Sequence, residues 1–118
     1  MTKVSRGDVV LVWFPNSDLK TFKRRPALVV QADGLETGIP QVVIAMITSN
    51  LARRRHPSRV FISLKSPEAV AGGLRTDSII MTDNLATVLF KAVAGRLGHI
   101  EARGAVDSAL RHTLGLEP

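Results

Sequence analysis

Short runs of β-branched and aromatic residues, each bounded by turn-forming residues, recur along this 118-residue chain. Such runs are typical of β-strands, because branched and aromatic side chains pack well on a pleated, half-buried surface. We expect strands over residues 8–14, 26–31, 41–48, 59–64, 77–82 and 92–97. Strands at such short spacing predict a mainly β domain whose largely antiparallel sheet closes into a small barrel.

Two of the expected strands indicate their own place in the sheet. Residues 41–48 are almost continuously apolar, as expected of a strand that is buried on both faces. Pro26 has no backbone N–H, so it belongs at the first position of its strand or on a sheet edge. Residues 85–90 are ambiguous, and a helical turn is one interpretation of them.

The C-terminal part of the chain predicts one amphipathic helix. Between about residues 101 and 114, apolar residues recur in steps of three and four, namely Val106, Ala109, Leu110 and Leu114. Gly115 follows as the expected helix stop. The remaining segments, 15–24, 33–40, 51–58 and 66–76, are polar or rich in glycine and proline, so we expect loops there.

Length and composition predict one compact domain over residues 1–118. The chain contains no cysteine, which excludes disulfides and thiolate metal sites, and no spaced histidine or carboxylate cluster supports a zinc site. No apolar run approaches the roughly 20 residues of a membrane span, and the N-terminus lacks the apolar core of a signal peptide. We therefore expect a cytoplasmic protein without membrane association, metal or cofactor.

The net charge of +6 is concentrated in two of the expected loops. Of the 16 lysine and arginine residues, four lie within residues 20–25 and four within residues 53–59. Clusters of this kind create a local field that attracts polyanions and accelerates their capture. We favour nucleic acid as the partner. Solvated loops that keep a small protein in solution, or an acidic protein partner, account for the same charge pattern.

Two polar residues stand at the ends of neighbouring apolar strands. Arg25 enters the second expected strand, and Thr48 leaves the third. If these strands are neighbours in the sheet, the two side chains lie beside each other at one rim. The pair combines a guanidinium, which binds phosphate through two parallel hydrogen bonds, with a hydroxyl that forms hydrogen bonds. This combination suggests chemistry on a nucleic-acid backbone.

Several short motifs occur in order along nearly the whole chain. They are Arg6-Gly7-Asp8-Val9, Arg25-Pro26-Ala27-Leu28-Val29-Val30-Gln31, Ile47-Thr48-Ser49, Asp77-Ser78 and Asp83-Asn84. Together they resemble the MazF/PemK family of bacterial toxins, the sequence-specific mRNA interferases of type II toxin–antitoxin systems. The resemblance implies an SH3-like β-barrel of the CcdB/MazF/Kid type and a homodimer. It also implies a metal-free endoribonuclease acting on single-stranded RNA, and an acidic, partly disordered MazE-like antitoxin that covers the RNA groove.

The resemblance implies that Arg25 and Thr48 are the catalytic pair. Metal-free RNA cleavage uses the neighbouring 2′-OH as nucleophile and leaves a 2′,3′-cyclic phosphate and a 5′-OH end. Arg25 suits neutralisation of the developing phosphorane charge, whereas an arginine is an unusual general acid because its guanidinium stays charged. Thr48 can orient Arg25 or donate a hydrogen bond to the phosphate. The structural alternatives are a salt-bridged strand-end arginine and an ordinary β-branched strand residue.

One departure from the family concerns the fifth strand. Some members carry an arginine two residues before the aspartate there, and that position is Met81 in this chain. Asp83 can act as a base or contact a nucleobase, and Asn84 can do the latter with its amide. Both residues are equally typical of turns. His56 can transfer a proton or contact a base, although a surface histidine in a charged loop is the simpler interpretation.

The residues that we expect to contact RNA gather in the basic segments and around the fifth strand. They are Lys20, Phe22, Lys23, Arg24, Arg53, Arg54, His56, Asp83 and Asn84. Phe22 can stack on a base or anchor its loop to the barrel. His99 and His112 have no pattern that supports catalysis or metal binding.

Two functions of other classes remain open at this point. A gyrase-poisoning CcdB-like toxin has a similar barrel and does not need Arg25 and Thr48. A non-catalytic RNA-binding SH3-like module is the second alternative.

Overall fold

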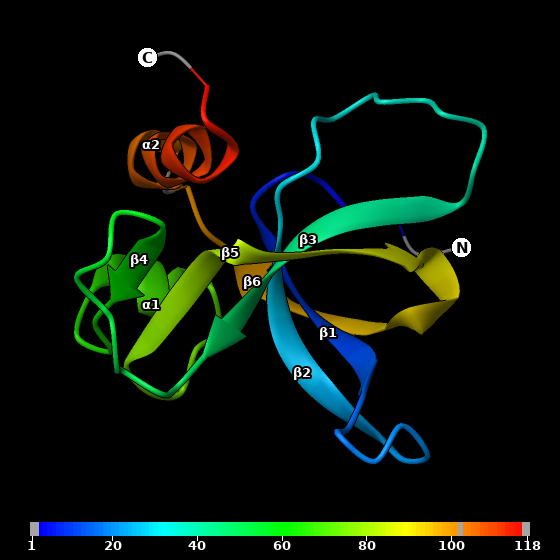
Figure 1. Ribbon diagram of the computed structural model, residues 1–118, viewed down its shortest axis with the longest axis horizontal. Helices are drawn as coiled ribbons and strands as arrows, with labels where there is room; N and C mark the ends of the chain where they lie inside the picture. Colours follow the sequence, from blue (N-terminus) through cyan, green and yellow to red (C-terminus); the bar gives the residue numbers. More distant parts are fainter. Residues whose placement is uncertain (1–2, 102, 117–118) are drawn as a thin grey trace.

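The computed structural model describes residues 3–101 and 103–116, which form one six-stranded antiparallel sheet and two helices (Figure 1). The strands are β1 (Asp8–Pro15), β2 (Phe22–Val29), β3 (Gln41–Thr48), β4 (Arg59–Ile62), β5 (Ser78–Leu89) and β6 (Val93–His99). The helices are α1 (Pro67–Ala71) and α2 (Arg103–Leu114), and η1 (Phe90–Ala92) is a single 3₁₀ turn. The strand order is β4-β5-β3-β2-β1-β6. The mainly β class with a C-terminal helix is confirmed.

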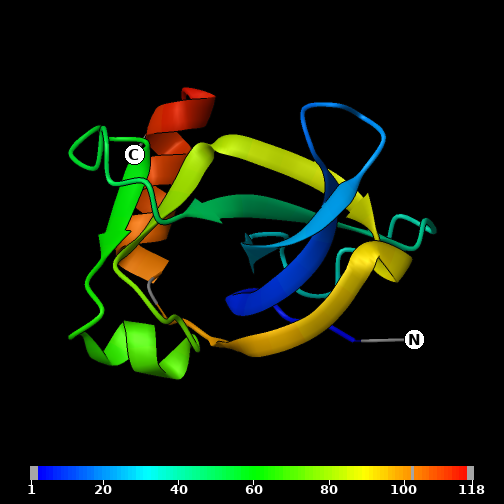
Figure 2. The same cartoon turned by 90° about the horizontal axis from the view of Figure 1, so that it is seen from below.

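The sheet curls strongly, but the predicted closure into a barrel is wrong (Figure 2). In the described part of the chain, β4 and β6 are the two edges and do not pair with each other. β4 is only four residues long, and both helices lie near these edges. α2 packs against β4 and β5, and α1 packs against β6. Helices therefore take the place of the strand pairing that would close a barrel.

β3 is buried on both of its faces, as its apolar sequence predicts. Val42, Ile44 and Met46 belong to one apolar cluster, inside the curl of the sheet, with residues of β1, β2 and β6. Ala45 and Ile47 belong to a second cluster, which includes residues of α1 and α2. Successive side chains of a strand point to opposite faces, so a strand between two cores must be apolar at nearly every position.

β2 begins earlier than the sequence suggests, so the predicted loop over residues 15–24 is too long. Phe22 pairs with Pro15 and Arg25 pairs with Val12, which places Lys23, Arg24 and Arg25 within the strand and leaves Lys20 in the turn. β3 pairs only with residues Ala27 to Val29 of β2. Pro26 consequently lies where β2 has no partner on the β3 side, so its missing N–H removes no necessary hydrogen bond.

β5 runs to Leu89, and the 3₁₀ turn η1 begins at Phe90. The interpretation of residues 85–90 as a helical turn is therefore wrong for all but the last residue. The strand contains a bulge, because Met46 pairs with Met81 whereas the preceding Ala45 pairs with Leu85. Three residues, 82–84, are therefore extra to the β3 register. Thr82, at the bulge, is fully buried and donates its hydroxyl hydrogen to the carbonyl of Ser58 at 2.6 Å. A bulge bends a strand and increases its twist, which suits the curl of this sheet.

The predicted loop over residues 66–76 contains the short helix α1. Its signal is present in the sequence, because Ser66 is the N-cap residue and Pro67 opens the first turn. The Ser66 hydroxyl accepts a hydrogen bond from the backbone N–H of Ala69 at 3.2 Å. The predicted C-terminal helix is confirmed, and Gly115 follows its last residue with a φ of 69°.

Glycines allow the end of α1 to approach β6 closely. A Cβ atom at Gly98 would lie 2.1 Å from the carbonyl oxygen of Ala71 and 2.7 Å from the carbonyl carbon of Gly72. A Cβ atom at Gly73, whose φ is +68°, would lie 2.5 Å from the carbonyl oxygen of Leu97. The two backbones are therefore in direct contact, and no side chain separates them.

We predict that Gly98→Ala destabilises the fold by about 3 kcal/mol, because the new methyl group meets backbone atoms that cannot move aside. Gly95→Ala is the matched control, since a Cβ at this other glycine of β6 has no heavy atom within 4 Å. Chemical denaturation followed by circular dichroism measures both variants. Equal midpoints for the two variants would contradict the close approach of α1 to β6.

Candidate functional site

A groove with a volume of about 560 Å³ lies where β2, the end of β3 and the α1–β5 connection meet. Its lining combines cations, hydroxyls and an apolar floor. The residues are Leu11, Lys23, Arg24, Arg25, Pro26, Ile47, Thr48, Ser49, Gly73, Leu74, Arg75, Thr76, Ser78 and Leu97. Residues of five strands, β1, β2, β3, β5 and β6, therefore line the groove.

The register of β2 and β3 explains why Arg25 and Thr48 share this groove. Ala27 pairs with Met46, and each step toward the N-terminus of β2 is a step toward the C-terminus of β3. Arg25 and Thr48 lie two residues beyond this last pair, each on its own strand, and both line the groove. The groove therefore contains both residues of the predicted pair.

A residue of the turn between β1 and β2 orients the side chain of Arg25. One guanidinium nitrogen donates a hydrogen bond to the side-chain oxygen of Asn16 at 3.3 Å. Asp18 organises this turn, because it accepts hydrogen bonds from the backbone N–H groups of Lys20 at 2.9 Å and Thr21 at 3.0 Å. These backbone hydrogen bonds hold the pKa of Asp18 below its ordinary value, and the hydrogen bond from Thr21 has the largest effect. A neutral partner such as Asn16 orients Arg25 without cancelling its charge.

Thr48 is oriented by the turn that follows β3. Its side-chain oxygen accepts a hydrogen bond from the backbone N–H of Asn50 at 3.1 Å. The side chain of Asn50 in turn accepts one from the backbone N–H of Ala52 at 3.0 Å. Because the oxygen of Thr48 is an acceptor in this turn, its hydroxyl hydrogen is free to donate to a ligand in the groove.

The groove is strongly positive. Lys23, Arg24, Arg25 and Arg75 line it, and no carboxylate or imidazole is among its described lining residues. Arg24 lies over the half-exposed ring of Trp13, with 5.7 Å between the guanidinium carbon and the ring centroid. A concave surface lined by one sign of charge concentrates ions of the opposite sign.

The other predicted RNA contacts do not line this groove. Lys20 and Phe22 lie at the β1–β2 turn that borders it, and the ring of Phe22 is exposed. Arg53 and Arg54 lie in the β3–β4 loop, beyond Ser49. The guanidinium carbon of Arg54 lies 5.8 Å from the centroid of the Phe61 ring of β4, so this guanidinium already has a contact within the protein.

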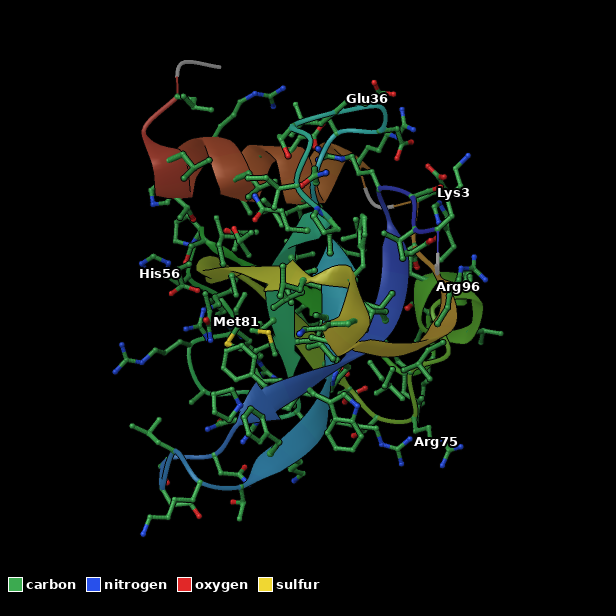
Figure 3. The ribbon with its side chains drawn as sticks, turned by 90° about the vertical axis from the view of Figure 1, so that its right-hand side faces the viewer. Lys3, Glu36, His56, Arg75, Met81 and Arg96 are labelled. Atoms are coloured by element: carbon green, nitrogen blue, oxygen red, sulfur yellow. The ribbon has the colours of Figure 1, made fainter. Side chains whose placement is uncertain are left out.

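His56 is also separate from the groove and is engaged in local structure. Figure 3 shows His56 and Arg75 on opposite sides of the molecule. Nδ1 of His56 accepts a hydrogen bond from the backbone N–H of Ser58 at 3.1 Å, and the Ser58 hydroxyl lies 2.7 Å away. The ring meets that of His112 edge-on, with 5.9 Å between centroids. The interpretation of His56 as a surface histidine fits this geometry better than proton transfer does.

Asp83 forms an ion pair that leaves it unsuited to act as a base. Both of its carboxylate oxygens accept hydrogen bonds from Arg59, at 2.8 and 3.1 Å. Burial raises the pKa of Asp83, but the hydrogen bonds and charge of Arg59 outweigh burial and hold the pKa below its ordinary value. Asn84 follows in the bulge and is exposed, and Met81 packs against the cluster inside the curl.

His99 has a structural role. Its Nδ1 lies 2.8 Å from the buried carboxylate of Asp8, and its Nε2 lies 2.6 Å from Glu101. Hydrogen bonds to Asp8 and Glu101, in that order, raise the pKa of His99. The imidazole thus ties the start of β1 to the segment between β6 and α2.

Arg75 is a groove residue that sequence reasoning missed. Arg75 lies in residues 66–76, where the sequence predicts only a loop. The packing of α1 on β6 brings this segment to the groove. In the described part of the chain, no three histidine, aspartate or glutamate side chains are arranged to hold a metal ion. No described helix has both the length and the apolar character required to cross a membrane.

Known structures share this fold. The structure of the Mycobacterium tuberculosis toxin MazF-mt6 superposes with a TM-score of 0.73 over 94% of this chain and 99% of its own, at 21% identity. A mycobacterial endoribonuclease in complex with its cognate antitoxin superposes with the same TM-score over 98% of this chain and 99% of its own, also at 21% identity. At this identity the likeness shows the fold alone.

Sequence comparisons identify the family. The chain is 32% identical over 105 residues to Endoribonuclease MazF6 of Mycobacterium tuberculosis, which covers 86% of this chain and 88% of that protein. It is 29% identical over 94 residues to Endoribonuclease EndoA of Bacillus subtilis, covering 78% and 77% of the two chains. The family description "PemK-like, MazF-like toxin of type II toxin-antitoxin system" matches residues 5–114. The expected family and its endoribonuclease class are confirmed, and the chain belongs to the PemK-like, MazF-like toxins of type II toxin–antitoxin systems.

Proposed function

We propose that this toxin cleaves single-stranded mRNA at a short recognised sequence, without ribosome or metal, and that the groove of Arg25 and Thr48 is its active site. The observation that carries this proposal is the lining of the groove, which holds the guanidinium of Arg25 and the hydroxyl of Thr48 in a positive surface. Both groups suit the anionic transition state of phosphoryl transfer.

The proposed reaction uses the substrate's own 2′-OH as nucleophile. The 2′-oxygen forms a bond to phosphorus as the bond to the 5′-oxygen breaks, which leaves a 2′,3′-cyclic phosphate and a 5′-OH end. The guanidinium of Arg25 binds the non-bridging oxygens, where negative charge accumulates in the transition state. Thr48 donates its hydroxyl hydrogen to the same phosphate. The proton of the 2′-OH passes to solvent hydroxide, and the 5′-oxygen takes a proton from water.

We predict that Arg25→Ala and Thr48→Ala each lower the cleavage rate by about 10²–10³, since each removes a contact that strengthens in the transition state. Arg25→Lys is also slow, because a point charge cannot replace the fork. The assay incubates purified protein with a long transcript in EDTA and maps the ends of the products. Arg111→Ala, an exposed substitution outside the groove, is the control.

The same assay separates this proposal from its alternatives. Cleavage at one recurring short sequence with cyclic-phosphate ends supports the endoribonuclease. Retention of RNA without cleavage supports a binding module, and DNA breaks that require gyrase support the CcdB-like mode. If Arg25→Ala cleaved RNA at close to the wild-type rate, the catalytic assignment would be wrong.

We predict that the cleavage rate at saturating RNA rises by about tenfold per pH unit from pH 6 to pH 8, without a plateau. The described lining of the groove holds no carboxylate or imidazole that could remove the 2′-OH proton, so we expect hydroxide to do so. The measurement is single-turnover cleavage in buffers of constant ionic strength. A bell-shaped profile, or a plateau that disappears in Asp83→Asn or His56→Gln, would show that a protein group acts as the base.

We also propose that an acidic, partly disordered antitoxin segment occupies the groove and inhibits cleavage. A mycobacterial structural neighbour is in complex with its cognate antitoxin, and the four groove cations lack carboxylate partners in the described chain. Such a segment orders as it binds and competes with RNA for the same charges.

Reversal of two groove charges, Lys23→Glu with Arg24→Glu, is expected to weaken RNA and the acidic segment together. The matched pair Arg53→Glu with Arg54→Glu reports whether the β3–β4 loop belongs to the same binding surface. Fluorescence anisotropy with labelled RNA and with the labelled antitoxin segment measures both affinities. Loss of RNA binding with full antitoxin affinity in both double variants would place the antitoxin elsewhere.

The homodimer that the family resemblance implies is part of this proposal. The apolar strand β3 does not supply the contact surface, because a single chain already buries most of it. Exposed Phe61 and Leu64 near β4, and Leu114 and Leu116 at the end of α2, supply apolar surface for a second copy. Sedimentation velocity at micromolar concentration tests this, and a stable monomer there would contradict it.

A further inference from the structure

We propose that Arg75 binds a phosphate of the RNA strand other than the scissile one, and so positions the substrate across the groove. This inference rests on the proposed function of the groove. It assigns a role to a residue outside the Arg25–Thr48 pair, and it makes the α1–β5 connection part of the RNA-binding surface.

The first support is the charge environment of Arg75. Four other arginines of the described chain, Arg6, Arg59, Arg96 and Arg103, form ion pairs with carboxylates at 2.5 to 3.5 Å. Arg75 has no such partner among the described residues and lines the groove with an exposed side chain. An unpaired guanidinium in a concave positive surface is available to an anionic ligand without first breaking a contact.

The second support is the rigidity of the backbone that carries Arg75. On its N-terminal side, Gly73 is fixed against the backbone of Leu97, in the close contact between α1 and β6. On its C-terminal side, the Ser78 hydroxyl donates to the carbonyl of Thr76 at 2.8 Å. Asp77 accepts a hydrogen bond from the backbone N–H of Leu64 at 2.7 Å. The segment is therefore held from both ends, which lowers the entropic cost of binding through Arg75.

The third support is the position of Arg75 relative to the proposed chemistry. Arg25 comes from β2 and Thr48 from β3, and these strands are neighbours in register. Arg75 comes from a different part of the lining, the connection that enters β5. A single strand of RNA has one phosphate per nucleotide, so a ligand whose scissile phosphate meets Arg25 extends other phosphates along the groove. Contacts to such phosphates add affinity without contributing to the transition state.

The experiment compares Arg75→Gln, Arg75→Lys and the control Arg111→Gln, which removes the same charge from an exposed site outside the groove. Binding of a random-sequence single-stranded RNA pool is measured by anisotropy over a range of salt concentrations. Cleavage kinetics on a long transcript give kcat and KM. Thermal denaturation confirms that all three variants remain folded.

We expect Arg75→Gln to weaken RNA binding and raise KM by about tenfold, the loss of one charge-assisted contact, with kcat unchanged. The slope of log affinity against log salt falls by about 0.7, the value for one phosphate contact on a single strand. Arg75→Lys retains the slope because it retains the charge. Arg111→Gln leaves affinity, KM and slope as in the wild type.

Three results would overturn the proposal. An unchanged salt slope in Arg75→Gln shows that Arg75 contacts no phosphate. A fall in kcat with unchanged KM places Arg75 in the chemistry instead. In the anisotropy assay with the labelled antitoxin segment, run on the same variants, a loss of affinity for that segment without loss of RNA binding shows that the residue serves a protein partner. If the wild type binds the RNA pool but does not cleave, the proposed function fails, and the salt slope still decides the role of Arg75.

Discussion

The burial of β3 on both faces is the constraint on which the rest of this molecule depends. One face packs inside the curl of the sheet, and the other packs toward the helices, so the strand has no freedom to slip. A shift by one residue would turn every side chain to the opposite core. The registers with β2 and β5 are fixed in consequence, and with them the place of Thr48 at the end of β3 and the bulge at residues 82–84.

The positive charges of this protein fall into two groups with different roles. Some arginines join elements of the fold, as Arg59 does when it holds Asp83 at the bulge and as Arg6 does when it pairs with Asp107 of α2. The groove cations have no carboxylate partners in the described chain, and two of them are arranged by neutral groups, Asn16 for Arg25 and the ring of Trp13 for Arg24. The segregation leaves the field of the groove uncancelled while the fold still benefits from ion pairs.

The sequence predicted the parts of the fold and site that follow local rules. Strand positions follow from apolar runs, and Arg25 and Thr48 from the ends of adjacent strands. The sequence could not reveal features that depend on contacts between distant segments. The extension of β2 to Phe22 is decided by its pairing with β1, which overrides the polar character of its residues. The place of Arg75 depends on α1 meeting β6 backbone to backbone, and barrel closure fails because helices occupy the edges. The helix α1 was readable from Ser66 and Pro67, whose capping signal is local.

The distribution of groove residues between strands and turns has a consequence for how such a toxin diversifies. Arg25 lies within β2 and Thr48 at the end of β3, next to a register that two cores lock, so few substitutions nearby can move them without cost to the fold. The turn over residues 16–21 and the segment over residues 74–76 border the same groove and carry little of the core. Loop residues of this kind tolerate exchange far better than strand residues do. Under the proposed function, a lineage with this architecture can therefore alter the RNA sequence it selects by changing its turns, while the reaction at the sheet stays constant.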